Sequence, residues 1–193
     1  MRQLNKMINL SSKRFTFSLL CAITFLLIFS ACSGTDYQTV SEFNIRVGMP
    51  INDVKKLYPD SKFQSESPNQ FGLCSSGEDG ISVYRNDSLL FYFWKDWERD
   101  QVGGFILFDS NQAYQGVHPG MTVSDFLRIH PNAVGTISLM DSKEYLFVPS
   151  NDDWYQVEST LDDLSANYKM VEGEYEFLEF RDLEKRISSI FVK

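Results

Sequence analysis

The stretch that decides the predicted fold is residues 45–60, IRVGMPINDVKKLYPD, because it recurs without gaps in residues 117–132, VHPGMTVSDFLRIHPN. Self-similarity at a constant offset is the mark of an internal repeat. Gly, Met, Asp and Pro are identical at four aligned positions, and apolar residues recur at 45/117, 51/123, 54/126 and 57/129. The chain therefore reads as two copies of one structural unit.

Each copy predicts a tight turn followed by a short helix. Gly48 and Gly120 suit a turn that needs a positive φ, and Thr122 with Asp125 three residues later approximates a capping box. Pro59 and Pro131 disfavour helix in the residues before them, so the helix ends after about two turns. Since such a short helix is not stable alone, it must dock on another element.

Strand patterns follow each copy of the repeat. Apolar and β-branched runs separated by polar turn residues predict strands at 81–84, 88–94 and 103–108 after the first copy, and at 144–148, 154–158, 175–180 and 187–192 after the second. The predicted fold class is α+β, with two tandem repeats, each a short helical segment packed on an antiparallel meander. The predicted domains are residues 41–110 and 111–193.

The first 31 residues have the pattern of an export signal. Arg2, Lys6, Lys13 and Arg14 precede an almost wholly apolar run from residue 15 to residue 29, as in a secretory signal. At 1.5 Å per residue this run spans roughly 22 Å, less than the ~30 Å hydrocarbon core of a bilayer. We therefore predict a signal peptide over 1–31 and not a membrane-spanning helix.

The junction Phe29-Ser30-Ala31-Cys32-Ser33-Gly34 resembles the lipobox of bacterial lipoproteins, in which small residues precede an acylated Cys. The resemblance implies a lipid on Cys32, a tether over 32–40, and, because residue 33 is Ser and not Asp, a place on the periplasmic face of the outer membrane. The alternative is an ordinary cleaved signal with a chance Cys. Several acyl chains on Cys32 would anchor the protein far more firmly than a single chain does.

The net charge excludes one class of partner. Residues 32–193 keep 14 of the 18 basic side chains and all 26 acidic ones, a net charge of −12. Such an acidic surface repels phosphate backbones, so we expect no nucleic-acid partner. Cys74 is then the one remaining thiol, and its alternatives are burial as a small apolar residue or a redox or intermolecular role.

The repeat also supports a family resemblance. The Gly-Met-x-x-x-Asp turn and helix, followed by antiparallel strands in a small lipoprotein, resembles the outer-membrane assembly lipoproteins typified by BamE. Its doubling resembles the tandem architecture of the β-lactamase inhibitor proteins. Both resemblances imply a protein-interaction module that is not an enzyme.

Catalytic, metal and cofactor motifs are missing from the sequence. The two histidines, His118 and His130, form no His-x-x-x-His pair, and no P-loop, nucleophile elbow or dinucleotide fingerprint occurs. The Asp152-Asp153 and Asp162-Asp163 pairs lack the alternating spacing of a calcium loop. We expect no metal, no cofactor and no enzymatic activity.

Aromatic residues are the candidate partner-binding groups. The run LFYFW at 90–94 places large apolar side chains on both faces of one strand, and aromatic residues commonly anchor protein interfaces. The candidates are Tyr92, Trp94, Trp97, Trp154 and Tyr155. The alternatives are that they only fill the core, or that the protein is a periplasmic carrier with an apolar or acyl ligand between its sheets.

Overall fold

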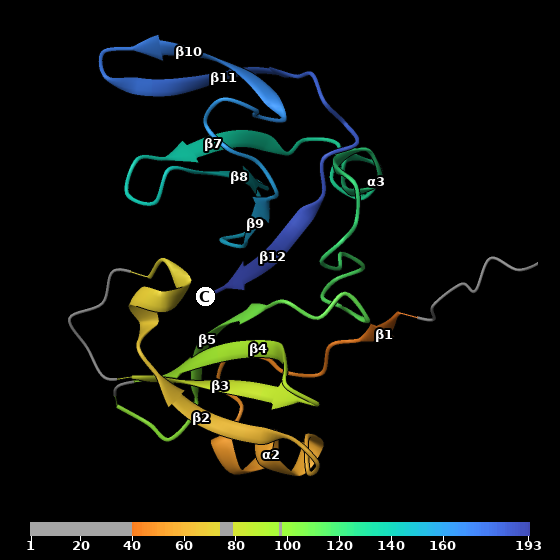
Figure 1. Cartoon of the computed structure of the whole chain (residues 1–193), viewed down its shortest axis with the longest axis vertical. Coiled ribbons are helices and arrows are strands. Elements are labelled where there is room, and N and C mark those ends of the chain that lie inside the picture. Colours follow the sequence, from red (N-terminus) through yellow and green to blue (C-terminus); the bar gives the residue numbers. More distant parts are fainter. Residues whose placement is uncertain (1–39, 74–78, 97) are drawn as a thin grey trace, which may run out of the picture. The chain divides into compact units, whose positions relative to one another are not determined.

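The computed structural model describes residues 40–73, 79–96 and 98–193. Their elements all belong to one unit, residues 39–193 (Figure 1). The elements are β1 (Ser41–Glu42), α2 (Ile51–Leu57), β2 (Lys62–Glu66), the 3₁₀ helix η1 (Pro68–Phe71), β3 (Gly80–Arg85), β4 (Ser88–Lys95), β5 (Val102–Leu107), β6 (Gln112–Ala113), α3 (Val123–Ile129), β7 (Val134–Ser138), β8 (Lys143–Phe147), β9 (Trp154–Val157), β10 (Ala166–Val171), β11 (Glu174–Phe180) and β12 (Ile187–Val192). No helix in these ranges has both the length and the apolar character needed to cross a bilayer.

The predicted fold class is wrong, because strands dominate and eight of them form one antiparallel sheet. The strand order is β2-β3-β4-β5-β12-β9-β8-β7. The C-terminal strand β12 pairs with β5 on one side and with β9 on the other, so Ile190 lies opposite both Leu107 and Tyr155. The two expected meanders are therefore parts of a single sheet and not separate helix-on-meander repeats. The physical reason is that β5 and β9 would each leave an unpaired row of backbone groups, which β12 satisfies.

The local elements of the repeated segments nevertheless form as the sequence predicts. Gly48 and Gly120 have φ of 81° and 90°. The Thr122 side chain caps α3 by accepting a hydrogen bond from the Asp125 N–H, at 3.1 Å. Both helices are seven residues long and end just before Pro59 and Pro131.

The predicted strands are confirmed to within a residue or two, but five strands of the described chain were missed. The seven predicted runs correspond to β3, β4, β5, β8, β9, β11 and β12. The missed strands are the two-residue strands β1 and β6 and the longer strands β2, β7 and β10, of which β2 and β7 are the two edges of the large sheet. Polar residues or glycine interrupt their apolar pattern, so a search for alternating hydrophobicity passes over them.

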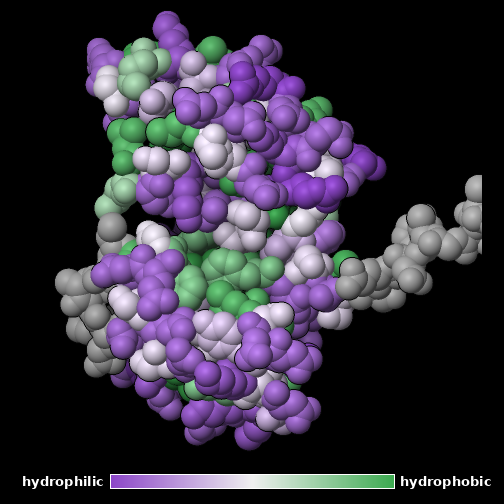
Figure 2. All heavy atoms as spheres, viewed as in Figure 1, coloured by the Kyte–Doolittle hydropathy of each residue, from purple (hydrophilic) through white to green (hydrophobic). Residues whose placement is uncertain are grey.

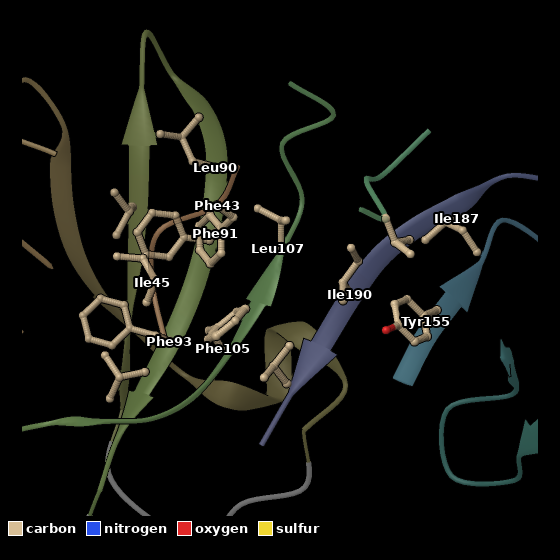
Figure 3. Packing of buried hydrophobic residues seen from close by; sticks show 14 of the residues in the cluster. Phe43, Ile45, Leu90, Phe91, Phe93, Phe105, Leu107, Tyr155, Ile187 and Ile190 are labelled. Atoms are coloured by element: carbon tan, nitrogen blue, oxygen red, sulfur yellow. The ribbon is translucent and has the colours of Figure 1, made fainter. Parts of the chain in front are cut away.

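The two faces of the large sheet differ in what packs on them. On the first face, one cross-strand row runs through all eight strands, and buried residues of α2 and α3 pack on this face. Figure 3 shows part of this core, with side chains from β4, β5, β9 and β12. The row is Phe63, Val83, Phe91, Leu107, Ile190, Tyr155, Leu146 and Gly135.

The β10–β11 hairpin forms a separate two-stranded sheet near strand β7. Gly135 lets it come close, since a Cβ there would lie 2.4 Å from the Tyr168 hydroxyl and 2.9 Å from the Phe177 ring. The fully buried Glu144 carboxylate accepts hydrogen bonds from Ser165 N at 2.7 Å, Ala166 N at 3.1 Å and Tyr168 Oη at 2.9 Å. This carboxylate therefore fixes the start of the hairpin on the first face.

Candidate functional site: an aromatic sheet face

The second face of the large sheet brings together three of the five predicted aromatic residues. Tyr92 on β4 and Trp154 on β9 belong to one cross-strand row, and Trp94 lies two residues further along β4. The row crosses all eight strands through Gln64, Ser82, Tyr92, Ile106, Phe191, Trp154, Phe147 and Val134. Pairing of distant strands, and not sequence proximity, creates this surface.

The other two predicted residues lie elsewhere. Tyr155 follows Trp154 on β9, so its side chain points to the first face, where it is fully buried and its ring centroid lies 4.7 Å from that of Phe126. Tyr155 thus offers no exposed surface to a partner. Trp97 lies outside the described residues, as do Cys32, Cys74 and the predicted signal peptide.

The second face has a buried floor and a half-buried rim. Tyr92 and Ile106 are 0% exposed, and Tyr145 and Phe191 are also buried. Phe71, Leu73, Trp94, Phe108 and Trp154 pack around them and are only partly buried. Both α-helices pack on the first face. The second face is contacted instead by the 3₁₀ helix η1, whose Phe71 ring centroid lies 4.2 Å from that of Tyr92.

A glycine determines how Trp94 lies. A Cβ on Gly104 would sit 2.0 Å from Cζ2 of Trp94, so the indole occupies the space that a side chain would need on β5. Gly80 likewise leaves space for the Tyr92 ring, because a Cβ at position 80 would lie 2.2 Å from the Tyr92 hydroxyl. Residues without side chains thus let the aromatic rings lie along the sheet. Sequence reasoning missed this arrangement, although Gly104 lies in the predicted strand 103–108, where glycine often marks such a close approach, and Gly80 directly precedes the predicted strand 81–84.

Polar groups border the aromatic surface at its β8 end. Lys143 Nζ and Ser189 Oγ both donate to Gln156 Oε1, at 3.3 Å each. The Tyr145 hydroxyl donates to Asp141 Oδ2 at 2.5 Å. Burial, together with the neighbouring Asp141 carboxylate, raises the pKa of Tyr145 and keeps it neutral. The surface therefore has the apolar centre and polar border that interfaces have.

A second group of polar residues lies near the end of α3. His130 follows the helix, and its ring centroid is 5.0 Å from that of Phe126 and 5.9 Å from that of Tyr155. Among the described residues, His130 Nε2 has no hydrogen-bond partner. Burial lowers the pKa of His130, so its imidazole is neutral at neutral pH. In the described part of the chain, no three His, Cys, Asp or Glu residues are arranged to hold a metal ion.

Asp153 gives a pH-dependent prediction. It is 5% exposed, and its burial, with Asp152 beside it, raises its pKa above the ordinary 3.8. When the pKa of an acid is higher in the folded protein than in the unfolded chain, folding costs more once the acid must ionise. The contribution to the free energy of unfolding is therefore fully favourable at a pH below the pKa of the unfolded chain, and it is lost as the pH rises through the pKa of the folded protein. We expect Asp153→Asn to raise the Tm at neutral pH, with the gain vanishing at about pH 3, where both states of the wild type are protonated. Thermal unfolding of both proteins across this range tests it, and an unchanged or lower Tm at neutral pH contradicts it.

Comparisons with known proteins do not supply a family. No family model matches this chain, and no curated protein matches it. Among solved structures, the chain is similar to the uncharacterized protein YfeY from Escherichia coli, with 14% sequence identity, a TM-score of 0.46, and coverage of 81% of this chain and 96% of that one.

Proposed function

We propose that this protein is a lipid-anchored cell-envelope protein that binds a protein partner through the aromatic second face of its sheet. The observation behind this proposal is the continuous second-face row with half-buried Trp94 and Trp154 at its rim. Its action is binding and not catalysis. The anchor is the acylated Cys32, at the periplasmic face of the outer membrane.

The chain length between anchor and domain supports a partner at the membrane. Seven residues, 33–39, separate Cys32 from Val40, where the described chain begins. At about 3.3–3.6 Å per extended residue, the eight steps from Cys32 to Val40 span at most about 29 Å. Ser41 is then fixed, since its N–H donates to the Asn111 carbonyl at 2.9 Å and β1 pairs with β6. The tether therefore keeps the start of the domain close to the membrane surface, where membrane proteins are within its reach.

The packing favours a protein binder over a carrier of an apolar ligand. A carrier needs an open apolar cavity, whereas Phe91, Phe105 and Ile190 on the first face are 0% exposed and in mutual contact with the helices and strands around them. The second face is instead partly open. Figure 2 shows an apolar area framed by polar residues where Figure 1 shows β5 and β12. Large aromatic groups at the centre of such an area commonly supply most of the binding energy.

The test is crosslinking of the full-length chain in cells, followed by identification of the crosslinked proteins. We expect one dominant envelope protein with the wild type, and loss of most of this crosslink in a Trp94→Ser, Trp154→Ser double variant. Removing two interface anchors of this kind typically weakens binding by at least about 2 kcal/mol, or roughly thirtyfold. Circular dichroism must first establish that the double variant folds.

Two further variants serve as controls. Leu178→Ser removes an apolar side chain that is 55% exposed on β11, and we expect it to keep the crosslink. Cys32→Ala is expected to move the protein out of the membrane fraction, which tests the anchor separately. Absence of a specific partner with the wild type, or equal loss with Leu178→Ser, contradicts the proposed binding surface.

A further inference from the structure

A small pocket lies beside the C-terminal end of α3, away from the aromatic second face. Two hydrogen-bonded turns form its walls, His130 to Ala133 and Val148 to Asn151. Ala133 N donates to the His130 carbonyl at 3.1 Å, and Asn151 N donates to the Val148 carbonyl at 3.0 Å. The pocket has a volume of about 270 Å³ and is lined by Ile129, His130, Pro131, Asn132, Val148, Pro149 and Ser150.

Prolines restrict the backbone in both walls of this pocket. Each turn has a proline at its second position, Pro131 and Pro149, which restricts the backbone to one φ region. Behind the pocket, His130 packs on Phe126, which is 0% exposed, and Val148 is itself buried. A preformed site loses little conformational entropy when a ligand enters.

The lining defines the chemistry of the occupant. Ile129, Pro131, Val148 and Pro149 contribute apolar groups to a half-open pocket whose lining is about equally polar and apolar, and His130 lies among them. The side chains of Asn132 and Ser150 lie on exposed residues, where they can donate or accept a hydrogen bond. None of these lining residues is an acid, and burial keeps the imidazole neutral, so a charged ligand would lose hydration without gaining a counterion.

The volume limits the size of the occupant. Pockets that enclose drug-sized ligands have about 300–1,000 Å³, so about 270 Å³ fits one ring and its substituent. We propose that this pocket binds a phenolic ring, with the ring between the two proline turns and the hydroxyl toward Asn132 and Ser150. A hydroxyl suits this mouth because it both donates and accepts hydrogen bonds. The same chemistry is present in the tyrosine of a protein and in a free phenol.

The experiment measures binding to the full-length protein, purified in detergent, by NMR of the Ile129 and Val148 methyl groups. The probes are p-cresol, N-acetyl-tyrosinamide and benzoate. We expect saturable shifts with at least one of the two phenols and binding of benzoate weaker by at least about tenfold. Tighter binding of N-acetyl-tyrosinamide than of p-cresol identifies a protein tyrosine as the occupant, and the reverse order identifies a free phenol.

Pocket-filling variants make the result specific. Ser150→Trp and, on the opposite turn, Asn132→Trp place an indole at the mouth of the pocket, and we expect either to weaken phenol binding by at least about tenfold. Ser88→Trp, at an exposed turn on β4, is the matched control and should bind as the wild type does. The proposal is overturned if neither phenol gives saturable shifts, if benzoate binds equally well, or if a folded Ser150→Trp or Asn132→Trp protein still binds. Because the probes are small molecules and the pocket lies apart from the second face, this outcome does not depend on the proposed binding of a protein to that face.

Discussion

Replacing Glu144 with Ala is expected to lower the free energy of unfolding by about 3–5 kcal/mol. The carboxylate is fully buried and accepts three hydrogen bonds from the start of the β10–β11 hairpin. In the variant, the backbone N–H groups of Ser165 and Ala166 and the Tyr168 hydroxyl lose their acceptor. A buried donor without an acceptor costs about 1–3 kcal/mol. The loss is therefore a large part of the 5–15 kcal/mol typical of a folded domain.

Urea unfolding and amide hydrogen exchange measure this effect and its location. The amides of β10 and β11 should lose protection first, because the carboxylate joins this hairpin to β8. Glu144→Gln keeps one carbonyl acceptor of the same length and should lose less stability than Ala does. Glu176→Ala, an exposed residue on β11, should change the free energy by less than about 0.5 kcal/mol. Equal effects of Glu144→Ala and Glu176→Ala would show that the three hydrogen bonds contribute nothing to stability.

Replacing Phe91 with Ala is expected to cost about 3–5 kcal/mol, the usual range for a buried phenylalanine. Phe91 is 0% exposed and stands in the middle of the first-face core. Its ring centroid lies 5.2 Å from that of Phe43 and 4.9 Å from that of Tyr58. These contacts join β4 to the segment before α2 and to the residue after it, so the cavity cannot close without moving the helix.

The matched experiment uses Phe91→Leu and Leu178→Ala. Phe91→Leu keeps a large apolar side chain and should lose clearly less stability than Phe91→Ala. Leu178 is exposed, so its truncation should leave the urea midpoint almost unchanged. A Phe91→Ala protein as stable as the Leu178→Ala protein would mean that the first-face core is not the main source of stability.

The composition of the candidate binding surface was only partly predictable from sequence. The run LFYFW at 90–94 does place apolar groups on two faces, with Phe91 and Phe93 on the first and Tyr92 and Trp94 on the second. Trp154 and Tyr155 looked equivalent in the sequence, yet alternation along β9 sends them to opposite faces. Strand register decides which residues face the core, because a shift of one position moves every side chain of the strand to the opposite face of the sheet.

Phe71 and Leu73 had no sequence signal at all as part of this surface. They stand in a short turn-rich segment, and only the path of the chain across the sheet brings Phe71 against Tyr92. The pocket beside α3 was equally hidden. Its walls come from two turns that begin at residues 130 and 148, 18 residues apart in the sequence. The sequence of each turn alone indicates only an ordinary surface turn.

What the sequence alone determined is local. Glycine at a positive φ, a threonine cap and a proline after two helical turns act on neighbouring residues, so α2, α3 and seven of the strands follow from the residues themselves. The tertiary structure alone decided that the strands form one sheet. β12 pairs with β5 across about 80 residues of chain, and that pairing depends on backbone groups left open at two distant edges, which no local pattern encodes.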